Sequence, residues 1–396
     1  MNRGDGLRSA SSLPGHPGAS TRLVIAMKLR AHRSSISWLL LSLLPAASFA
    51  AAEPKFDHYV HLTPENSAIG NFPAQKAPIL TVKSSAIVKV DTGGGAGWRN
   101  PKMDPDEWLR QNGVPTTMEN PALKETALVL EKATRYAGIE NGHLLVGPIA
   151  IEGAMPGDSI EVRILSVVPR IPYGTTGRGP GRSLRQLDSD KPPNKVTVFD
   201  LKRNVGLFEP GVEVPLGPFM GVMGLLPPAS DGPNRRSGPP GAFAGNLDCK
   251  ELTAGSTLYM PVFHKGGLFF TGDAHAAQGD GEITGTAIET ANTAVFQFIL
   301  HKGKTLKSPR AETATHYITF GLDTDLDDAM QLAVDDMVDF MHEAKGWDMF
   351  RTLPLASMAV DFRITQIVDG TKGIHAMIPK SLFVNDKSDY WYKPGK

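Results

Sequence analysis

Apolar and polar residues alternate along several short segments of the chain. In residues 159–165, Ile160 and Val162 fall on one face while Glu161 and Arg163 fall on the other. This alternation is typical of a half-buried β-strand. The same pattern recurs at residues 79–82, 86–90, 195–201, 257–263, 294–300, 316–320 and 360–368, with Gly and Pro clusters between them. The chain is therefore predicted to be mainly β.

One longer segment has the spacing of a helix. Its apolar residues follow the i, i+3, i+4, i+7 pattern that places them on a single helix face: Met330, Ala333, Val334, Met337, Val338 and Met341. Asp327 is the predicted N-cap and Gly346 the predicted C-terminal stop.

Three aspartates before this helix superficially resemble a calcium-binding loop. They are Asp323, Asp325 and Asp327, but the sixth position is Asp328 and the twelfth is Val334. A calcium loop needs Gly and Glu at those positions. The acidic run instead suits the positive end of a helix dipole.

Composition supports a globular β-rich protein without a polyanionic partner. Lys plus Arg and Asp plus Glu each number 41, and no basic stripe with aromatic residues indicates nucleic-acid binding. Gly and Pro, at 41 and 31 residues, suit many tight turns between short strands. The single cysteine, Cys249, excludes an internal disulfide framework.

The N-terminal region has the order of a secretory signal. From Met27, a basic segment is followed by an apolar stretch at residues 36–47 and by small residues at 48–52. The apolar stretch is shorter than the ~20 residues that span a bilayer, so we expect cleavage and no stable membrane span. We expect residues 1–50 to be leader and signal peptide, with Met1 or Met27 as the start, and 51–396 to be a periplasmic or secreted domain.

The densest group of polar residues lies in the segment GDAHAAQGDGE, residues 272–282. It contains Asp273, His275, Asp280 and Glu282. Imidazole nitrogen and carboxylate oxygen together suit zinc or a similar divalent ion. Alternatively, the Asp-Gly pairs are turn residues and His275 is a hydrogen-bonded structural histidine.

Two further segments offer candidate site residues. Asp248, in GNLDCKELTAGSTLYMPV, lies where a loop enters a predicted strand, as either a ligand or a turn residue. The segment HLLVGPIAIEGAMPGDSIEV begins at His143, and its Glu152 closes an apolar strand. A buried Glu at that position would have a raised pKa, which suits a general base.

These three segments resemble the acetamidase/formamidase family. The family patterns read approximately HPLTGPIYVEGAEPGD, GGNMDxKxLxxGSTLYLPV and GDGHAAQGDGE, and residues 218–226 and 360–379 also fit. The resemblance implies a β-rich fold, which we expect as a single large β-sandwich-like domain with a few helices. It also implies hydrolysis of short aliphatic amides to carboxylate and ammonia, and a homo-oligomer.

The positions that match the family motifs are all candidate site residues, although the loops around them differ. The family's Gly is replaced by Ala244 and Ala274, and its Pro and Thr after the histidine by Leu144 and Val146. These departures leave the substrate less defined than the chemistry. The matching candidates are His143, Glu152, Asp248, Asp273, His275, Asp280 and Glu282.

Amide hydrolysis at neutral pH requires a strong nucleophile, charge stabilisation for an oxyanion and a proton for the leaving amine. A divalent ion, most simply zinc, supplies the first two. We expect His275, Asp248 and His143 as ligands, with Asp273 or Asp280 as further ligands or their supports. Glu152 or Glu282, with His143, would serve the proton transfers.

Two alternatives remain open from the sequence. Cys249, beside Asp248, would be the nucleophile of a thiol amidase, although a sole cysteine entering a strand is more often a small buried apolar residue. A non-catalytic exported binding protein on the same fold is the other. Ammonia release from short amides distinguishes it from an enzyme.

Overall fold

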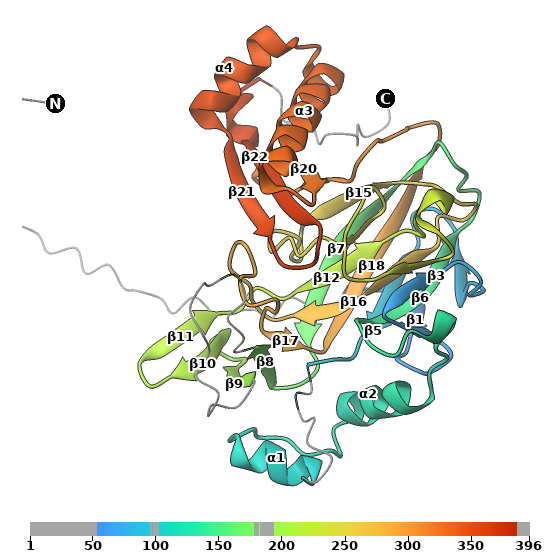
Figure 1. Cartoon of the computed structure of the whole chain (residues 1–396), viewed down its shortest axis with the longest axis vertical. Coiled ribbons are helices and arrows are strands. Elements are labelled where there is room, and N and C mark those ends of the chain that lie inside the picture. The colour runs from blue at the N-terminus through green and yellow to red at the C-terminus, as the bar shows by residue number, and fades with distance from the viewer. Residues whose placement is uncertain (1–53, 96, 98–102, 178–181, 183–193, 386–396) are drawn as a thin grey trace, which may run out of the picture. The chain divides into compact units, whose positions relative to one another are not determined.

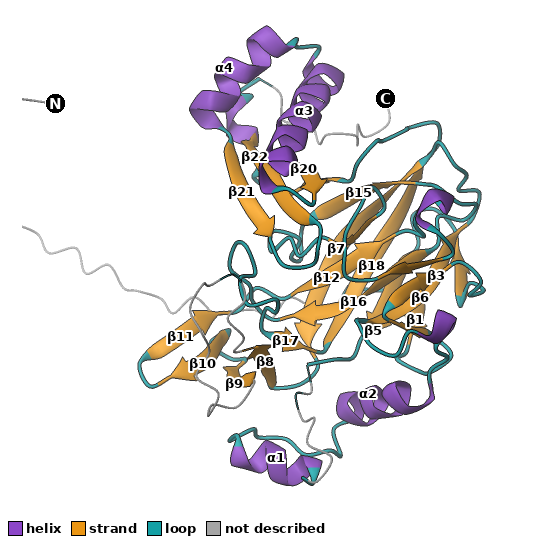
Figure 2. Ribbon diagram, in the orientation of Figure 1, coloured by secondary structure: helices purple, strands orange, loops and turns teal. Residues whose placement is uncertain are grey.

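Two large β-sheets form most of the protein. The structure is a computed structural model and describes residues 54–95, 97, 103–177, 182 and 194–385. The predicted leader and signal peptide therefore lie outside the described residues. Strands dominate this part of the chain, as Figure 2 shows, and the prediction of a mainly β single large domain with a few helices is confirmed.

The first sheet has nine strands, paired antiparallel except for β1 with β5. In spatial order they are β1 (His58–Val60), β5 (Ile87–Asp91), β18 (Asn292–His301), β7 (Ser159–Pro169), β15 (Thr257–Pro261), β19 (Arg310–Glu312), β20 (His316–Asp323), β22 (Lys372–Pro379) and β21 (Asp361–Gln366).

The second sheet has eleven strands, and β6 is the branch point at which β2, β4 and β16 meet. Its main path is β11 (Val212–Pro215), β10 (Val205–Glu209), β9 (Asn194–Asp200), β8 (Tyr173–Gly177), β17 (Glu289–Thr290), β16 (Phe269–His275), β12 (Phe219–Gly224) and β14 (Ala244–Asn246), with β6 (Leu144–Ile151), β2 (Ser67–Ile69) and β4 (Leu80–Val82) beside β16. A separate pair joins β3 (Asn71–Pro73) to β13 (Asn234–Arg236).

The main hydrophobic core lies between the two large sheets. Phe269 of β16 packs edge-on against Phe296 and Phe298 of β18, with ring centroids 5.5 and 5.0 Å apart. Alternate residues of strands from both sheets contribute to this core, including Ile160 and Val162 of β7. The alternation read from the sequence therefore marks the buried face of a sandwich.

Four α-helices lie among the described residues: α1 (Pro105–Gln111), α2 (Pro121–Lys132), α3 (Leu326–Lys345) and α4 (Met349–Ala359). Figure 1 shows α3 and α4 beside β20, β21 and β22, and α3 packs directly on β20 and β22. None of the described helices is long and apolar enough to span a membrane.

The predicted helix is α3, with one correction at its start. The Asp325 carboxylate accepts hydrogen bonds from the backbone N–H groups of Asp327 and Asp328, so the predicted N-cap, Asp327, is wrong by two residues. Any one of the three aspartates is a good capping residue by type. The predicted stop at Gly346 is confirmed, with φ of 66° at the C-cap.

Candidate metal and active site

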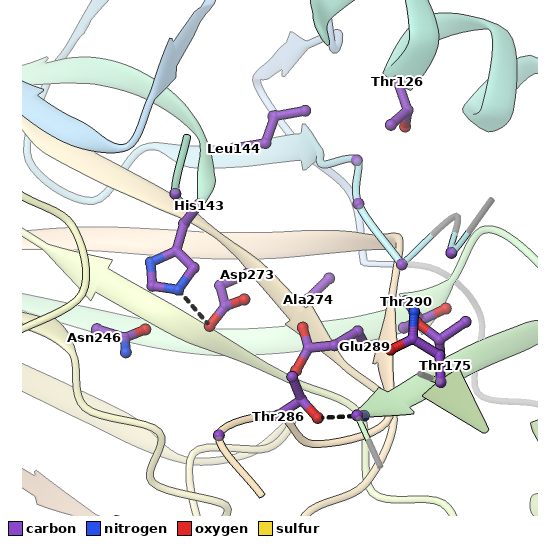
Figure 3. Close-up of a pocket in the computed structure, with 18 of the residues that line it drawn as sticks. Thr126, His143, Leu144, Thr175, Asn246, Asp273, Ala274, Thr286, Glu289 and Thr290 are labelled. Carbon is purple, nitrogen blue, oxygen red and sulfur yellow. Dashed lines mark hydrogen bonds and ion pairs between the residues drawn. The ribbon is translucent and has the colours of Figure 1, made fainter. Parts of the chain in front are cut away.

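A pocket of about 580 Å³ opens where β6, β16 and β17 meet the helix α2. Figure 3 shows His143 and Asp273 on one side of it, with Glu289, Thr175 and Thr290 on the other. Asp248, Glu282 and Asp369 also line it. Acidic side chains from distant parts of the sequence therefore share one cavity.

His275, the last residue of β16, lies at the centre of these acidic groups and is fully buried. Its Nε2 atom is 3.2 Å from Glu289 Oε1 and 3.3 Å from Asp273 Oδ2. Its Nδ1 atom is 3.9 Å from Asp248 Oδ1. Within the described part of the chain, neither ring nitrogen makes a hydrogen bond of acceptable geometry. Buried polar atoms without hydrogen-bond partners are rare in folded proteins. A metal ion bound to one nitrogen of His275 would supply the missing partner.

Five carboxylates surround this histidine in overlapping groups. The sets Asp248–Asp273–His275, His275–Glu282–Glu289 and Asp248–Glu282–Asp369 each hold ligand atoms within 4.8 Å of one another. Like charges at these separations repel strongly in a buried site. Imidazole and carboxylate groups gathered in this way fit a divalent cation, which would both neutralise and coordinate them.

The pKa values of the carboxyl groups reflect this crowding. Burial raises the pKa of Glu282 to about 9, and the charges of Glu289 and Asp273 add to the rise. Burial, followed by repulsion from Glu282 and Asp273, also raises the pKa of Asp248. For Asp273, the attraction of His143 and His275 overcomes burial and lowers the pKa.

Three of the site acids adopt left-handed backbone conformations that non-glycine residues rarely use. The φ angles are 50° at Asp248, 54° at Asp273 and 44° at Glu282. Such conformations cost roughly 1–3 kcal/mol each and concentrate at functional sites. Each of these three acids belongs to at least one of the ligand groups of the site.

Gly221 on β12 leaves the space into which these groups converge. A Cβ atom at this position would lie 2.5 Å from Asp273 Oδ2, 2.6 Å from Asp248 Oδ1 and 2.9 Å from His275 Cε1. Contacts this short do not occur for real Cβ atoms. The site therefore requires glycine at position 221, because any side chain would collide with these groups.

Two buried asparagines hold the site residues in place. Asn246 donates from Nδ2 to Asp248 Oδ2 at 2.8 Å and to Asp369 Oδ2 at 2.7 Å. Asn292 donates to the carbonyl oxygen of His275 at 3.0 Å. Supporting hydrogen bonds of this kind fix the direction of ligand side chains.

His143 lies nearer the mouth of the pocket. Its side chain is 24% exposed, and its Nε2 atom is 4.0 Å from Asp273 Oδ2, as the dashed line in Figure 3 marks. This position gives His143 access both to the acidic cluster and to a molecule entering from solvent.

Two predicted site residues lie elsewhere. Glu152 follows the far end of β6 from His143, roughly 25–30 Å along the strand at ~3.3 Å per residue. Its side chain is exposed, so the expected burial behind its role as a general base is wrong. Asp280 is also exposed and outside the pocket lining, where its carboxylate pairs with Arg363 at 2.6 Å. Glu152 lies in an exposed turn, where it needs no buried partner. Asp280 is held outside the pocket by its ion pair with Arg363.

The structure adds Glu289 and Asp369, which the sequence did not single out. Glu289 belongs to the two-residue strand β17, and Asp369 precedes a glycine in the β21–β22 connection, as an ordinary turn residue would. Asn246 could have been noticed from the sequence, because it lies in the GNLD segment only two residues before the candidate ligand Asp248. No local pattern marks Asp369, because its partner Asn246 is 123 residues away.

The thiol alternative does not fit the position of Cys249. This residue is 1% exposed and is not among the residues that line the pocket. Burial and the Glu251 carboxylate raise the pKa of the thiol, which disfavours the reactive thiolate.

Comparison with known proteins places the chain in a family. The acetamidase/formamidase family matches residues 131–231 and 229–385, and the chain therefore belongs to it. The formamidase of Methylophilus methylotrophus is 30% identical over 195 residues, which cover 36% of this chain and 47% of that protein. The acetamidase of Mycolicibacterium smegmatis is 30% identical over 200 residues, covering 36% and 49%. The chain spans about half the length of the curated relatives it matches.

A solved structure supports the same fold over more of the chain. The acetamidase of Bacillus halodurans is 26% identical and superposes with a TM-score of 0.65, covering 83% of this chain and 100% of that one.

Proposed function

We propose that this protein is an amidohydrolase that cleaves the C–N bond of a non-peptide amide, releasing carboxylate and ammonia, with a divalent metal ion in the pocket. The observation that carries the proposal is His275, a fully buried imidazole without hydrogen-bond partners among the described residues, ringed by five carboxylates. Membership of the acetamidase/formamidase family supports the reaction.

Zinc is the ion we propose, with His275, Asp248 and Asp273 as its first candidate ligands. Zinc binds imidazole nitrogen and carboxylate oxygen, and catalytic zinc sites keep a position open for water or substrate. A divalent ion supplies a water of lowered pKa and charge stabilisation for the oxygen of the amide. His143 is the fourth candidate, as a ligand or as a group that contacts substrate.

Glu282 is the residue we assign to proton transfer. It is 7% exposed, it lines the pocket, and its pKa of about 9 leaves it protonated at neutral pH until a cation binds nearby. A carboxyl group that exchanges a proton near the working pH can take it from water and deliver it to the leaving nitrogen. Glu289, whose Oε1 atom is 3.2 Å from His275 Nε2, is the residue we assign to orienting the imidazole.

The substrate we propose is a small amide of the formamide or acetamide type, or one somewhat larger. The relatives are named formamidase and acetamidase. A pocket of about 580 Å³ lies within the ~300–1,000 Å³ typical of small-molecule sites and exceeds what a one- or two-carbon amide needs. A longer acyl group would occupy the part of the pocket beside Thr126 and Leu130.

Ammonia release from formamide, acetamide and longer aliphatic or cyclic amides tests this proposal. We expect turnover of at least one amide, and a loss of 10²-fold or more in kcat for Glu282→Gln, as removal of a general acid–base group gives. Glu131→Gln, an exposed carboxyl on α2 beside the pocket, is the matched control and should stay within about twofold of wild type. Binding of amides without turnover would instead establish a non-catalytic binding protein.

We also propose that the protein acts in the periplasm or outside the cell and forms a homo-oligomer. The basic, apolar and small-residue order at residues 27–52 supports export. The exposed apolar side chains of Phe350 and Met358 on α4, 82% and 77% exposed, are compatible with subunit contact. N-terminal sequencing of protein from a cell fractionation and light scattering of the purified protein test the two statements. A cytoplasmic, unprocessed monomer would refute both.

A further inference from the structure

A second cluster of metal-type ligands lies outside the pocket, around the only cysteine of the chain. It consists of Cys249, Glu251 and His375, whose donor atoms all lie within 4.8 Å of one another. Cys249 and His375 are each 1% exposed, and the Glu251 side chain is 9% exposed. None of the three lines the pocket.

The spacing of the donor atoms is that of ligands sharing one ion. Cys249 Sγ is 3.5 Å from Glu251 Oε2, and His375 Nε2 is 3.3 Å from the same oxygen. Bond lengths to zinc of ~2.3 Å for sulfur and ~2.0 Å for nitrogen and oxygen, at tetrahedral angles, give S···O of about 3.5 Å and N···O of about 3.3 Å. Both separations agree with this geometry.

The imidazole of His375 points as a ligand would. Its Nε2 atom is buried and, within the described residues, makes no hydrogen bond, although Glu251 Oε2 is only 3.3 Å away. This geometry is expected if His375 Nε2 and Glu251 Oε2 both point at one ion between them and not at each other. Nδ1 is 2.8 Å from Thr365 Oγ1, the kind of contact that fixes a ligating histidine.

The two oxygens of Glu251 have separate partners. Oε1 accepts from Lys250 Nζ at 2.8 Å and from Arg363 Nη1 at 2.9 Å. Oε2 faces Cys249 and His375. The cations hold Oε1, while the only hydrogen bond to Oε2 among the described residues comes from the Cys249 thiol, itself a proposed ligand.

We propose that Cys249, Glu251 and His375 form a second metal site that binds zinc or a similar thiophilic divalent ion and is distinct from the catalytic pocket. Thiolate, imidazole and carboxylate together suit zinc. Coordination would join two segments that carry pocket residues. Cys249 follows Asp248 in the chain, and His375 shares the β21–β22 hairpin with Asp369. By fixing these two segments to each other, the ion would hold Asp248 and Asp369 in position.

Cobalt(II) titration of the reduced, metal-free full-length protein tests this site directly. A thiolate bound to cobalt gives a ligand-to-metal charge-transfer band in the near ultraviolet, and Cys249 is the only residue of the chain that can produce it. We expect this band to saturate at one ion per chain. A protein that is folded by circular dichroism and binds cobalt without this band would overturn the proposal.

Three variants separate this site from the pocket. Cys249→Ser should abolish the band, and His375→Gln should weaken the binding that produces it by tenfold or more. His275→Gln removes a pocket ligand and should leave the band in place, whatever the outcome of the amidase assay. Loss of the band in His275→Gln but not in His375→Gln would place the thiolate signal elsewhere and refute this ligand set.

Discussion

At the scale of single residues, the site combines backbone strain with missing side-chain volume. Asp248, Asp273 and Glu282 hold positive φ angles, and Gly221 provides the space that their carboxylates face. A sequence shows neither property, because both depend on which strands become neighbours. The residue types of the GDAHAAQGDGE segment grouped Asp273, His275, Asp280 and Glu282 as candidate ligands, with turn residues and a structural histidine as the alternative. Three of the four meet in the site, whereas Asp280 pairs with Arg363 outside the pocket lining.

Gly221→Ala is expected to weaken zinc binding at least tenfold while leaving every ligand in place. The added methyl group would lie 2.5 Å from Asp273 Oδ2 and 2.6 Å from Asp248 Oδ1, so one or both carboxylates must move. Zinc titration of the metal-free protein measures the change. Gly217→Ala is the control, because its Cβ would meet only Thr253 Cγ2 at an ordinary 3.9 Å. Equal zinc affinity in both variants would show that Gly221 does not shape the site.

The metal-free protein is expected to lose stability as pH rises from about 4.5 to about 9. Over this range Glu282 keeps its proton in the folded state, where its pKa is about 9, but loses it in the unfolded chain, where its pKa is 4.5. Folding therefore binds a proton, and the free energy of unfolding falls by about 1.4 kcal/mol per pH unit for one such group.

Urea denaturation of the metal-free protein between pH 5 and pH 8 measures this slope. Glu282→Gln has no proton to exchange and should show a shallower decline, although Asp248 and Glu289 contribute in the same direction. A wild-type stability that rises with pH, or an unchanged slope in the variant, would contradict the assignment.

At the scale of elements, the alternation of apolar and polar residues predicted several strands and one helix that bury a single face. Residues 159–165 lie in β7 and residues 316–320 in β20, and the periodic apolar face at 330–341 lies in α3. Three of the described helices were not predicted: α1, α2 and α4. The helix α1 is short, α4 contains Pro354, and α2 was missed although one of its faces is buried. The prediction for Glu152 failed because the apolar strand before it suggests a buried end, whereas the chain turns at the surface there.

The attachment of α3 to the first sheet depends on a buried arginine of β19. Arg310 bonds Asp336 at 2.8 Å and Glu343 at 2.7 Å, with its own side chain 4% exposed. Arg310→Met should lower the free energy of unfolding by about 3 kcal/mol, because it leaves the buried Asp336 carboxylate without its cation.

Thermal or urea denaturation checks this value against a surface ion pair that also joins α3 to the segment before β19. Lys307 bonds Asp339 at 2.8 Å with 87% of the lysine side chain exposed, and Lys307→Met should change stability by less than about 1 kcal/mol. If both substitutions cost the same, the Arg310 network would not anchor α3.

At the scale of the whole molecule, the pocket exists only when distant segments meet. Asn246 joins Asp248 to Asp369 across more than a hundred residues, and Glu289 reaches His275 from a strand of two residues. Motif likeness could predict the family and five residues of the candidate site, but it also selected Glu152 and Asp280, which lie elsewhere. It could not predict Glu289, Asp369 or the convergence on Gly221, since these follow from tertiary pairing alone.

The most direct test of the account is ammonia release by the metal-free protein before and after zinc is added back, with His275→Gln treated in parallel. We expect the metal-free wild type to be inactive, to regain activity with zinc, and the variant to stay at least 10²-fold below wild type at saturating zinc. Full activity in wild-type protein shown by elemental analysis to contain no metal would contradict a metal-assisted hydrolase and leave the carboxylates alone to account for the reaction.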